Sequence, residues 1–364
     1  MLRGGALRWR DGKHDAPELA LTGIRLAVLN NGRVHKAALQ APANGTLLRG
    51  PLDFRARFTH KALAPIGKPS NWTGDAYLST GPVDLPTLAR YVDMPLTMHA
   101  GRIDNTIWAN FHEGRLVNAG GYLQGADVAL RVRPTQPRLD LPVARFSWNT
   151  TLDAGHDYTL HLSRFHAELG QPPLPDGTPL ARTLAMSTLA ARYRVPSADQ
   201  GQLISVTGYR VDLGILSEFV RALPLPAHLR NQLIKIDPRG MVSNYRIEIE
   251  HAKPTPDEIA EEERSRHAVA TPVVRYRFLG DLQGISFAAQ EPPPGLTARG
   301  HPRAGWPGVE NLWGHVDASE TGGTTRFDTV NAAVTVPGAF DEPRLTFDRM
   351  RGNAKWVVTP APGD

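Results

Sequence analysis

The sequence predicts a mainly β, elongated fold built of repeated strands, with two short helical caps. The 34 Gly and 31 Pro residues are scattered between short alternating runs, which is typical of many strands joined by turns. In residues 52–58, apolar side chains alternate strictly with Asp53, Arg55 and Arg57, as in a half-buried strand. Apolar residues at helical spacing are concentrated in two segments, and these are the expected caps.

Composition excludes several classes of site. The 364 residues are 41% hydrophobic and 21% charged, which is ordinary for a folded protein. The net charge of +5 permits contact with anionic headgroups or polyanions, but no run of five or more Lys or Arg occurs, so no nucleic-acid partner is expected. The chain has no cysteine, which excludes disulfides, thiolate metal sites and Cys nucleophiles.

Neither a membrane-spanning helix nor a signal peptide is expected within this sequence. No segment approaches the 18 uninterrupted apolar residues of a spanning helix, and no apolar stretch follows Met1. If the protein works outside the cytoplasm, its targeting segment is absent from this chain.

The larger predicted cap lies at 212–237. Asp212 stands where an N-cap belongs, apolar residues follow at helical spacing to Leu223, and a second short helix stops at Pro238. A smaller cap at 84–92 begins with the same text, since both segments read Asp-Leu-x-x-Leu-x-x-aromatic-Val from Asp84 and Asp212. This similarity predicts a weak internal repeat.

Strands are predicted along the rest of the chain. Leu7 and Trp9 begin the series, a parity switch at Gly23 predicts a bulge, and residues 30–32 predict a hairpin turn. A Trp ends similar strand-like units at Trp9, Trp148 and Trp356, which suggests a structural role in each repeat. Further strands are expected at 76–79, 107–111, 128–132, 158–162, 189–195, 245–250, 274–278 and 330–336.

Two regions are expected. The first, 1–200, carries the short helix, and the second, 201–364, holds the larger cap followed by further strands; alternatively, the whole chain is one continuous elongated domain. Residues 254–272 are highly charged with almost nothing to bury, and they are expected to form an exposed insertion.

Several motifs in the second region carry a family resemblance. They are Pro-Arg-Gly at 238–240, Tyr-x-Phe-x-Gly-x-x-x-Gly-Ile at 276–285, Pro-Gly-x-x-Asn-Leu-x-Gly at 307–314 and Phe-x-Glu-Pro at 340–343. Together they resemble an internal part of the YhdP family, large AsmA-like proteins related to TamB. The chain departs from the family at Trp313, where a small residue is usual, and it lacks the N-terminal membrane anchor and the long C-terminal remainder.

The resemblance implies a non-enzymatic envelope protein on the periplasmic side of the inner membrane of a Gram-negative bacterium, held through an anchor absent from this chain. It also implies a long twisted β-sheet folded into an apolar groove that takes phospholipid acyl chains and carries phospholipid between the two membranes. The physics is consistent, because each CH₂ pulled into water loses about 0.8 kcal/mol of favourable burial. No cofactor is expected.

The predicted lining of this groove is the apolar side of the alternating strands. From alternation alone a closed core is the commoner outcome, whereas the resemblance favours an open groove. The predicted lipid-contacting residues are Leu52, Phe54, Phe58, Val128, Leu130, Val132, Tyr158, Leu160, Leu162, Tyr245, Ile247, Ile249, Val274, Tyr276 and Phe278.

Other candidate sites have simpler explanations. His156, His161 and His166 are spaced by five residues, which alternates strand faces and disfavours shared metal ligation. Glu248 and Glu250 share a strand face, where a solvated surface is a commoner role than acid–base catalysis. No Gly-x-Ser-x-Gly, Walker or Gly-x-Gly-x-x-Gly motif occurs, and no catalytic residue is assigned.

Two further functions stay open at this stage. One is a carbohydrate-binding or carbohydrate-active β protein that uses exposed Trp residues and the Glu248/Glu250 face. The other is a structural scaffold that binds partners through the edges of its sheet.

Overall fold

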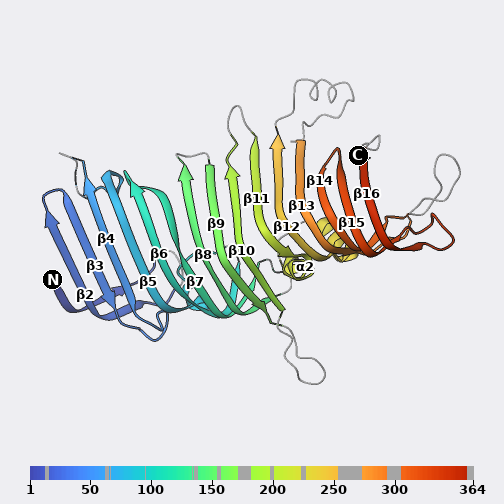
Figure 1. Cartoon of the computed structure of the whole chain (residues 1–364). Helices are drawn as coiled ribbons and strands as arrows, with labels where there is room; N and C mark the ends of the chain where they lie inside the picture. Colours follow the sequence, from blue (N-terminus) through green and yellow to red (C-terminus); the bar gives the residue numbers. More distant parts are fainter. Residues whose placement is uncertain are drawn as a thin grey trace, which may run out of the picture. The chain divides into compact units, whose positions relative to one another are not determined.

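A computed structural model of the chain describes residues 1–12, 16–61, 65, 67–94, 96–132, 134, 138–153, 157–170, 182–196, 201–222, 227–252, 273–292 and 305–358. The described part holds sixteen strands, and they form one open antiparallel sheet whose strand order follows the sequence. Figure 1 shows this order as a continuous change of colour from strand to strand. The prediction of a mainly β, antiparallel, repeated-strand fold is therefore confirmed.

The chain divides into two compact units. Unit 1 covers residues 1–185 together with 222–224, and unit 2 covers residues 186–221 and 225–364. The helical elements of unit 1 are η1 (Pro69–Asn71) and α1 (Leu85–Leu88). Its strands are β1 (Leu2–Trp9), β2 (Leu19–Asn31), β3 (Val34–Ala41), β4 (Leu52–His60), β5 (Trp72–Asp84), β6 (Thr97–His112), β7 (Arg115–Arg131), β8 (Leu139–Asp153) and β9 (Asp157–Leu169).

Strand β10 (Arg182–Arg194) begins in unit 1 and lies mostly in unit 2. Two helices of unit 2 follow β11, and they are α2 (Leu213–Ala222) and α3 (Ala227–Ile236). The remaining strands are β11 (Gln202–Asp212), β12 (Arg239–Ala252), β13 (Val273–Phe287), β14 (Gly308–Ser319), β15 (Gly322–Thr335) and β16 (Arg344–Val357).

Cross-strand register gives unit 1 an apolar and a polar face. Because alternate residues of a strand point to opposite faces, directly paired residues in neighbouring strands share a face. One row of pairs joins Leu39, Phe54, Leu78 and Ile107 on the apolar face. The next row, one residue along, is on the polar face and includes Asp53, Ser79 and Thr106 in β4 to β6.

Unit 2 repeats this division. Val206, Ile247, Phe278 and Ala318 form a paired row across β11 to β14 on the apolar face. The adjacent row on the polar face is Ser205, Glu248, Arg277 and Ser319. The strict alternation in the sequence therefore becomes two chemically distinct surfaces, as expected for an antiparallel sheet with one solvated face.

Left-handed residues bend the long strands. In unit 2 they include Asn244 in β12, Gly284 in β13, Asn311 in β14 and Asn331 in β15. Register shifts between β12 and β13 and between β14 and β15 span all four of these positions. Figure 1 shows the strands curving toward one end. Bulges of this kind bend strands, and Asn and Gly tolerate a positive φ better than other residues. In unit 1 the bulge predicted at Gly23 is confirmed, since Gly23 has φ 70 and the register of β1 with β2 shifts beside it.

The main buried cluster of unit 1 lies where β2, β3 and β5 meet the segment after β3. Its members include Ile24, Leu48, Val83 and Tyr91, each no more than 9% exposed. Tyr91 is fixed by a 2.7 Å hydrogen bond from its hydroxyl to the carbonyl of Pro17 and by stacking on Trp9 at 5.7 Å between ring centroids. This cluster closes one end of the apolar face of unit 1.

Both predicted caps begin at an Asp that ends a strand. Asp84 Oδ1 accepts hydrogen bonds from the Thr87 amide at 3.0 Å and the Thr87 hydroxyl at 2.7 Å, and Asp212 Oδ1 accepts from the Ile215 amide at 3.0 Å. The larger cap contains the two predicted helices. The smaller is shorter than predicted, because α1 stops at Leu88 and the chain turns through i→i+3 bonds to Tyr91.

The charged insertion expected at 254–272 lies outside the described residues. The hairpin turn expected at 30–32 is present between β2 and β3, with Gly32 at φ 57.

Removing the Asp84 cap should loosen α1. Asp84→Ala leaves the Thr87 amide without its acceptor and should cost about 1 kcal/mol of local stability. Hydrogen exchange of a peptide covering residues 85–92 should rise accordingly. Asp84→Asn is the matched control, because Asn also caps helices; equal exchange in the two variants would show that capping is not the cause.

Acid should have the same effect on the wild type. Burial opposes ionisation of Asp84, but bonds from Thr87 and the Arg49 guanidinium together hold the pKa of Asp84 below 3.8. A depressed pKa gives stability that is present above pH 3.8 and is lost as the pH falls through the folded pKa. Hydrogen exchange of residues 85–92 should therefore rise in the wild type as the pH falls below 3.8. It should not rise in Asp84→Asn, whose amide does not titrate.

Candidate functional site: the apolar face of the sheet

Most of the predicted lining residues of unit 1 share its apolar face. Leu52, Phe54 and Phe58 have the same parity in β4, and successive pairings carry that face across β5 to β8 as far as β9. There Leu162 pairs with Trp148 and Leu160 pairs with Thr150. The register therefore brings these side chains onto one shared face.

Val128, Leu130 and Val132 lie beyond a bend in β7. Asp127 has φ 53, and beyond it Val128 and Leu130 pair with Leu141 and Leu139 near the end of β7. Val128 is 7% exposed, and Val132 follows the last residue of β7. These residues are therefore separated by a bend from the rows that carry Phe54 and Leu160.

The six predicted lining residues of unit 2 are on one face. Ile247 pairs with Phe278 and Ile249 pairs with Tyr276, while Tyr245 and Val274 have the same parity in β12 and β13. The sequence signal was strict alternation, and the register found between β12 and β13 keeps all six together.

Exposure distinguishes this surface from a closed core. Leu160 and Ile247 are each 37% exposed and Tyr276 is 49% exposed, whereas core side chains are normally almost fully buried. Of the fifteen predicted residues, Val128 and Tyr245 are the buried ones. Large apolar side chains on this face are therefore accessible to solvent.

A lane of alanines crosses the apolar face of unit 1. Ala37, Ala56, Ala76, Ala109 and Ala119 are consecutive cross-strand partners in β3 to β7. At a strand spacing of ~4.8 Å, five strands give the lane a length of roughly 19 Å. The row on one side holds the large side chains of Leu39, Phe54, Leu78 and Ile107, so the alanines form the low part of the surface.

A cavity of about 710 Å³ lies over three of these alanines, Ala37, Ala56 and Ala76. It is bordered by Phe54 and Phe58 and by residues near the strand ends, among them Trp72 and Phe111. Its volume is in the range of small-molecule sites, which are commonly apolar with a few polar groups.

Aromatic rings gather at the hairpin end of this cavity, which we call the rim: His35, Phe58, His60 and Trp72. Ring centroids lie 4.3 Å apart between Phe58 and Trp72, 5.1 Å between His35 and Phe58, and 5.2 Å between His35 and His60. Stacked aromatics at such distances add to the stability of a sheet surface. His35 was not among the predicted lining residues, although its parity with Ala37 and Leu39 in β3 places it on the apolar face.

Glycines under aromatic rings shape the apolar face of unit 2. A Cβ on Gly208 would overlap the ring of Tyr245, and a Cβ on Gly323 would overlap the indole of Trp356. Gly208 pairs directly with Tyr245 across the strands, and Gly323 pairs directly with Trp356. A ring lying flat over a strand glycine protects the backbone that the missing side chain exposes.

The polar face carries ion pairs between strands. Bidentate contacts join Arg277 to Asp317 at 3.0 and 2.8 Å and Arg344 to Glu310 at 3.0 and 2.8 Å. The Arg277 guanidinium lowers the pKa of the Asp317 carboxyl, with burial opposing it. Such exposed pairs contribute little stability each, so their main effect is to keep this face charged and wet.

The carboxylates considered for catalysis belong to this face. Glu250 contacts Arg194 at 3.2 Å, and Glu248 lies 3.9 Å from Arg246. Of the three histidines, His156 lies outside the described residues, His161 pairs with Asn149 on the polar face, and His166 contacts Glu168 at 3.2 Å. No group of three or more metal-ligating side chains is found in the described ranges.

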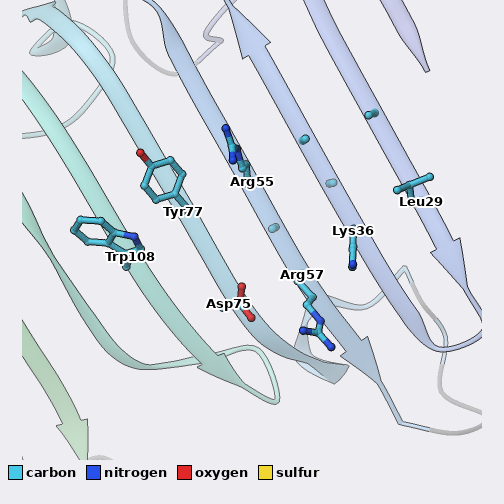
Figure 2. Close-up of a pocket in the computed structure, with 11 residues that line it drawn as sticks. Leu29, Lys36, Arg55, Arg57, Asp75, Tyr77 and Trp108 are labelled. Atoms are coloured by element: carbon cyan, nitrogen blue, oxygen red, sulfur yellow. The ribbon is translucent and has the colours of Figure 1, made fainter.

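A second hollow, of about 570 Å³, lies on the polar face of unit 1 (Figure 2). Figure 2 shows Tyr77 and Trp108 on neighbouring strands, with Arg57, Asp75 and Lys36 at one end. The rings of Tyr77 and Trp108 are 5.8 Å apart, and Trp108 is 52% exposed. Asp53 binds Arg55 at 2.6 Å, which leaves Arg57 and Lys36 as the cations without a described ion-pair partner here.

These features define a class of protein: an open antiparallel sheet with one accessible apolar face and one charged face. No helix in the described segments is long and apolar enough to cross a bilayer. The family model for the YhdP protein matches residues 2–361, so the chain belongs to the YhdP family. No curated protein and no solved structure matches the chain.

Filling the space under Tyr245 should displace its ring. Burial raises the pKa of the Tyr245 hydroxyl above 10.0. In Gly208→Ala the new methyl group should push the ring outward and lower that pKa toward its ordinary value. Ultraviolet titration should show one tyrosine shifted to lower pH, and Tyr245→Phe identifies which one. A Gly208→Ala titration identical to the wild type would contradict the packing described.

Proposed function

We propose that the apolar face binds phospholipid acyl chains and that the chain is a non-enzymatic part of an AsmA-like envelope protein that moves phospholipid between inner and outer membranes. The observation that carries the proposal is the accessible apolar face, with its lane of alanines between rows of larger side chains. Membership of the YhdP family supports the same conclusion.

The energetics suit transport of lipid past water. Each methylene transferred from an apolar surface to water costs about 0.8 kcal/mol, so a chain of sixteen carbons meets a barrier on the order of 10 kcal/mol. A continuous apolar surface removes most of this barrier without chemistry. The polar face stays hydrated, which allows such a sheet to work in an aqueous compartment.

This proposal places the protein at the periplasmic side of the inner membrane of a Gram-negative bacterium, with attachment through a membrane anchor. Membership of the YhdP family supports both points. Because transport of this kind needs no bond to be made or broken, no catalytic residue is required, and the ion pairs of Glu248 and Glu250 on the polar face fit a structural role.

Lipid binding should depend on which face is changed. We expect protein purified without detergent, after expression in a periplasm, to carry phospholipid in native mass spectrometry. Leu160→Asp and Ile247→Asp each place a charge on the apolar face and should remove most of the lipid, because a carboxylate is strongly disfavoured beside an acyl chain.

Neighbouring residues give matched controls. His161→Asp and Arg246→Asp place the same side chain on the polar face, one residue away, and should retain the lipid. Circular dichroism verifies that all four variants are folded. Absence of lipid from folded wild-type protein, or equal loss in the apolar-face and polar-face variants, would rule out the proposed site.

The hollow of Figure 2 favours a second candidate, binding of a saccharide on the polar face. Trp108 offers an exposed ring for the apolar side of a sugar, and Lys36, Arg57 and Asp75 offer hydrogen bonds to its hydroxyl groups. Saturation-transfer NMR measures saturation passed from the protein to an acidic oligosaccharide. Trp108→Ala should abolish this transfer, whereas Trp313→Ala, which removes an exposed Trp in unit 2, should not. Absence of transfer from the wild-type protein to the oligosaccharide would dismiss this candidate.

A further inference from the structure

A buried histidine nitrogen at the rim of the alanine lane has no partner. His35 is 4% exposed, and its Nδ1 lies 2.9 Å from Asn30 Oδ1. Its Nε2 is enclosed and makes no hydrogen bond with any described residue. A buried polar atom left in this state costs free energy, and it therefore calls for an explanation.

The hydrogen bond to Asn30 decides what Nε2 can bind. With Asn30 Oδ1 as acceptor, the neutral imidazole donates from Nδ1 and carries its free lone pair on Nε2. Nε2 is then an acceptor and needs a donor. A hydroxyl group or an ammonium group can supply one, whereas an ester carbonyl or a phosphate oxygen cannot.

The surroundings of His35 match a lipid lying with its headgroup at the rim. His35 lines the 710 Å³ cavity together with Ala37, Ala56 and Phe58, so an acyl chain on the lane has its polar end nearby. Because Nε2 is enclosed, contact requires a small movement, which the partly exposed His60 ring stacked on His35 can allow.

We propose that His35 Nε2 accepts a hydrogen bond from a donor in the phospholipid headgroup, so that unit 1 prefers lipids whose headgroup carries an N–H or O–H. This rests on the proposed function, because the acyl chains are taken to lie on the apolar face. The shared chemistry is a headgroup donor, which phosphatidylethanolamine supplies as an ammonium and phosphatidylglycerol as hydroxyls. Phosphatidylcholine supplies neither.

A headgroup series with identical acyl chains tests this on the wild-type protein. The full chain is stripped of lipid and incubated with phosphatidylethanolamine, its N-methyl and N,N-dimethyl derivatives, phosphatidylcholine or phosphatidylglycerol, and occupancy is measured by native mass spectrometry. Affinity should fall about tenfold at the last methylation, where the only remaining N–H is lost, since one hydrogen bond of ordinary strength corresponds to about that factor. Phosphatidylglycerol distinguishes a hydroxyl donor from an ammonium.

His35→Phe removes the nitrogen and keeps an aromatic ring in the stack. It should bind N,N-dimethyl-phosphatidylethanolamine and phosphatidylcholine equally while still binding both. His60→Phe is the matched control in the same stack and should keep the wild-type preference.

Three outcomes overturn parts of the argument separately. Equal binding of the whole series by the wild type, or a preference that survives in His35→Phe, would overturn the role of Nε2 and leave lipid binding intact. A wild type that binds none of the lipids would instead overturn the proposed function, and this inference with it. The headgroup series on the wild type remains decisive if His35→Phe does not fold.

Discussion

The structure depends on the register between neighbouring strands. Because side chains alternate with a period of two, a slip of one residue in a single strand would exchange its apolar and polar faces. The register found here aligns Leu39, Phe54, Leu78 and Ile107 in one row and places the charged residues in the next. Each unit thereby gains a continuous apolar surface that no single strand could provide.

Register alone would give straight strands, and the left-handed bulge residues add the bend. Asn244, Gly284, Asn311 and Asn331 occupy successive strands of unit 2, so the change of direction is shared by neighbours instead of breaking the ladder. The polar side chains of these residues also bond locally: Asn311 Nδ2 donates to the Val330 carbonyl at 2.9 Å, and Asn244 Nδ2 donates to Asp281 at 2.8 Å. A bend fixed in this way holds an apolar face open without a second layer being needed to shape it.

The two faces divide the work that a sheet in water must do. Paired charges such as Arg277 and Asp317 keep one face hydrated while adding little stability, and the apolar face remains available for a ligand. Small residues then decide where a ligand can lie: the alanines lower the surface in unit 1, and glycines in unit 2 let Tyr245 and Trp356 lie over the backbone. Rows of small and large side chains thus turn a flat sheet into a shaped surface.

Sequence alone determined the fold class, the strands, the Asp84 and Asp212 caps, and the face to which most of the predicted lining belongs, because alternation and capping are local properties. It failed where a distant contact decides, because α1 ends early as the chain turns to bring Tyr91 onto Trp9 and Pro17. The bend at Asp127, which separates Val128 from the other rows, was also not predicted. The alanine lane and the unpartnered nitrogen of His35 exist only in the folded sheet, since residues from five strands must be brought into one register before a row, a cavity or a buried polar atom is formed.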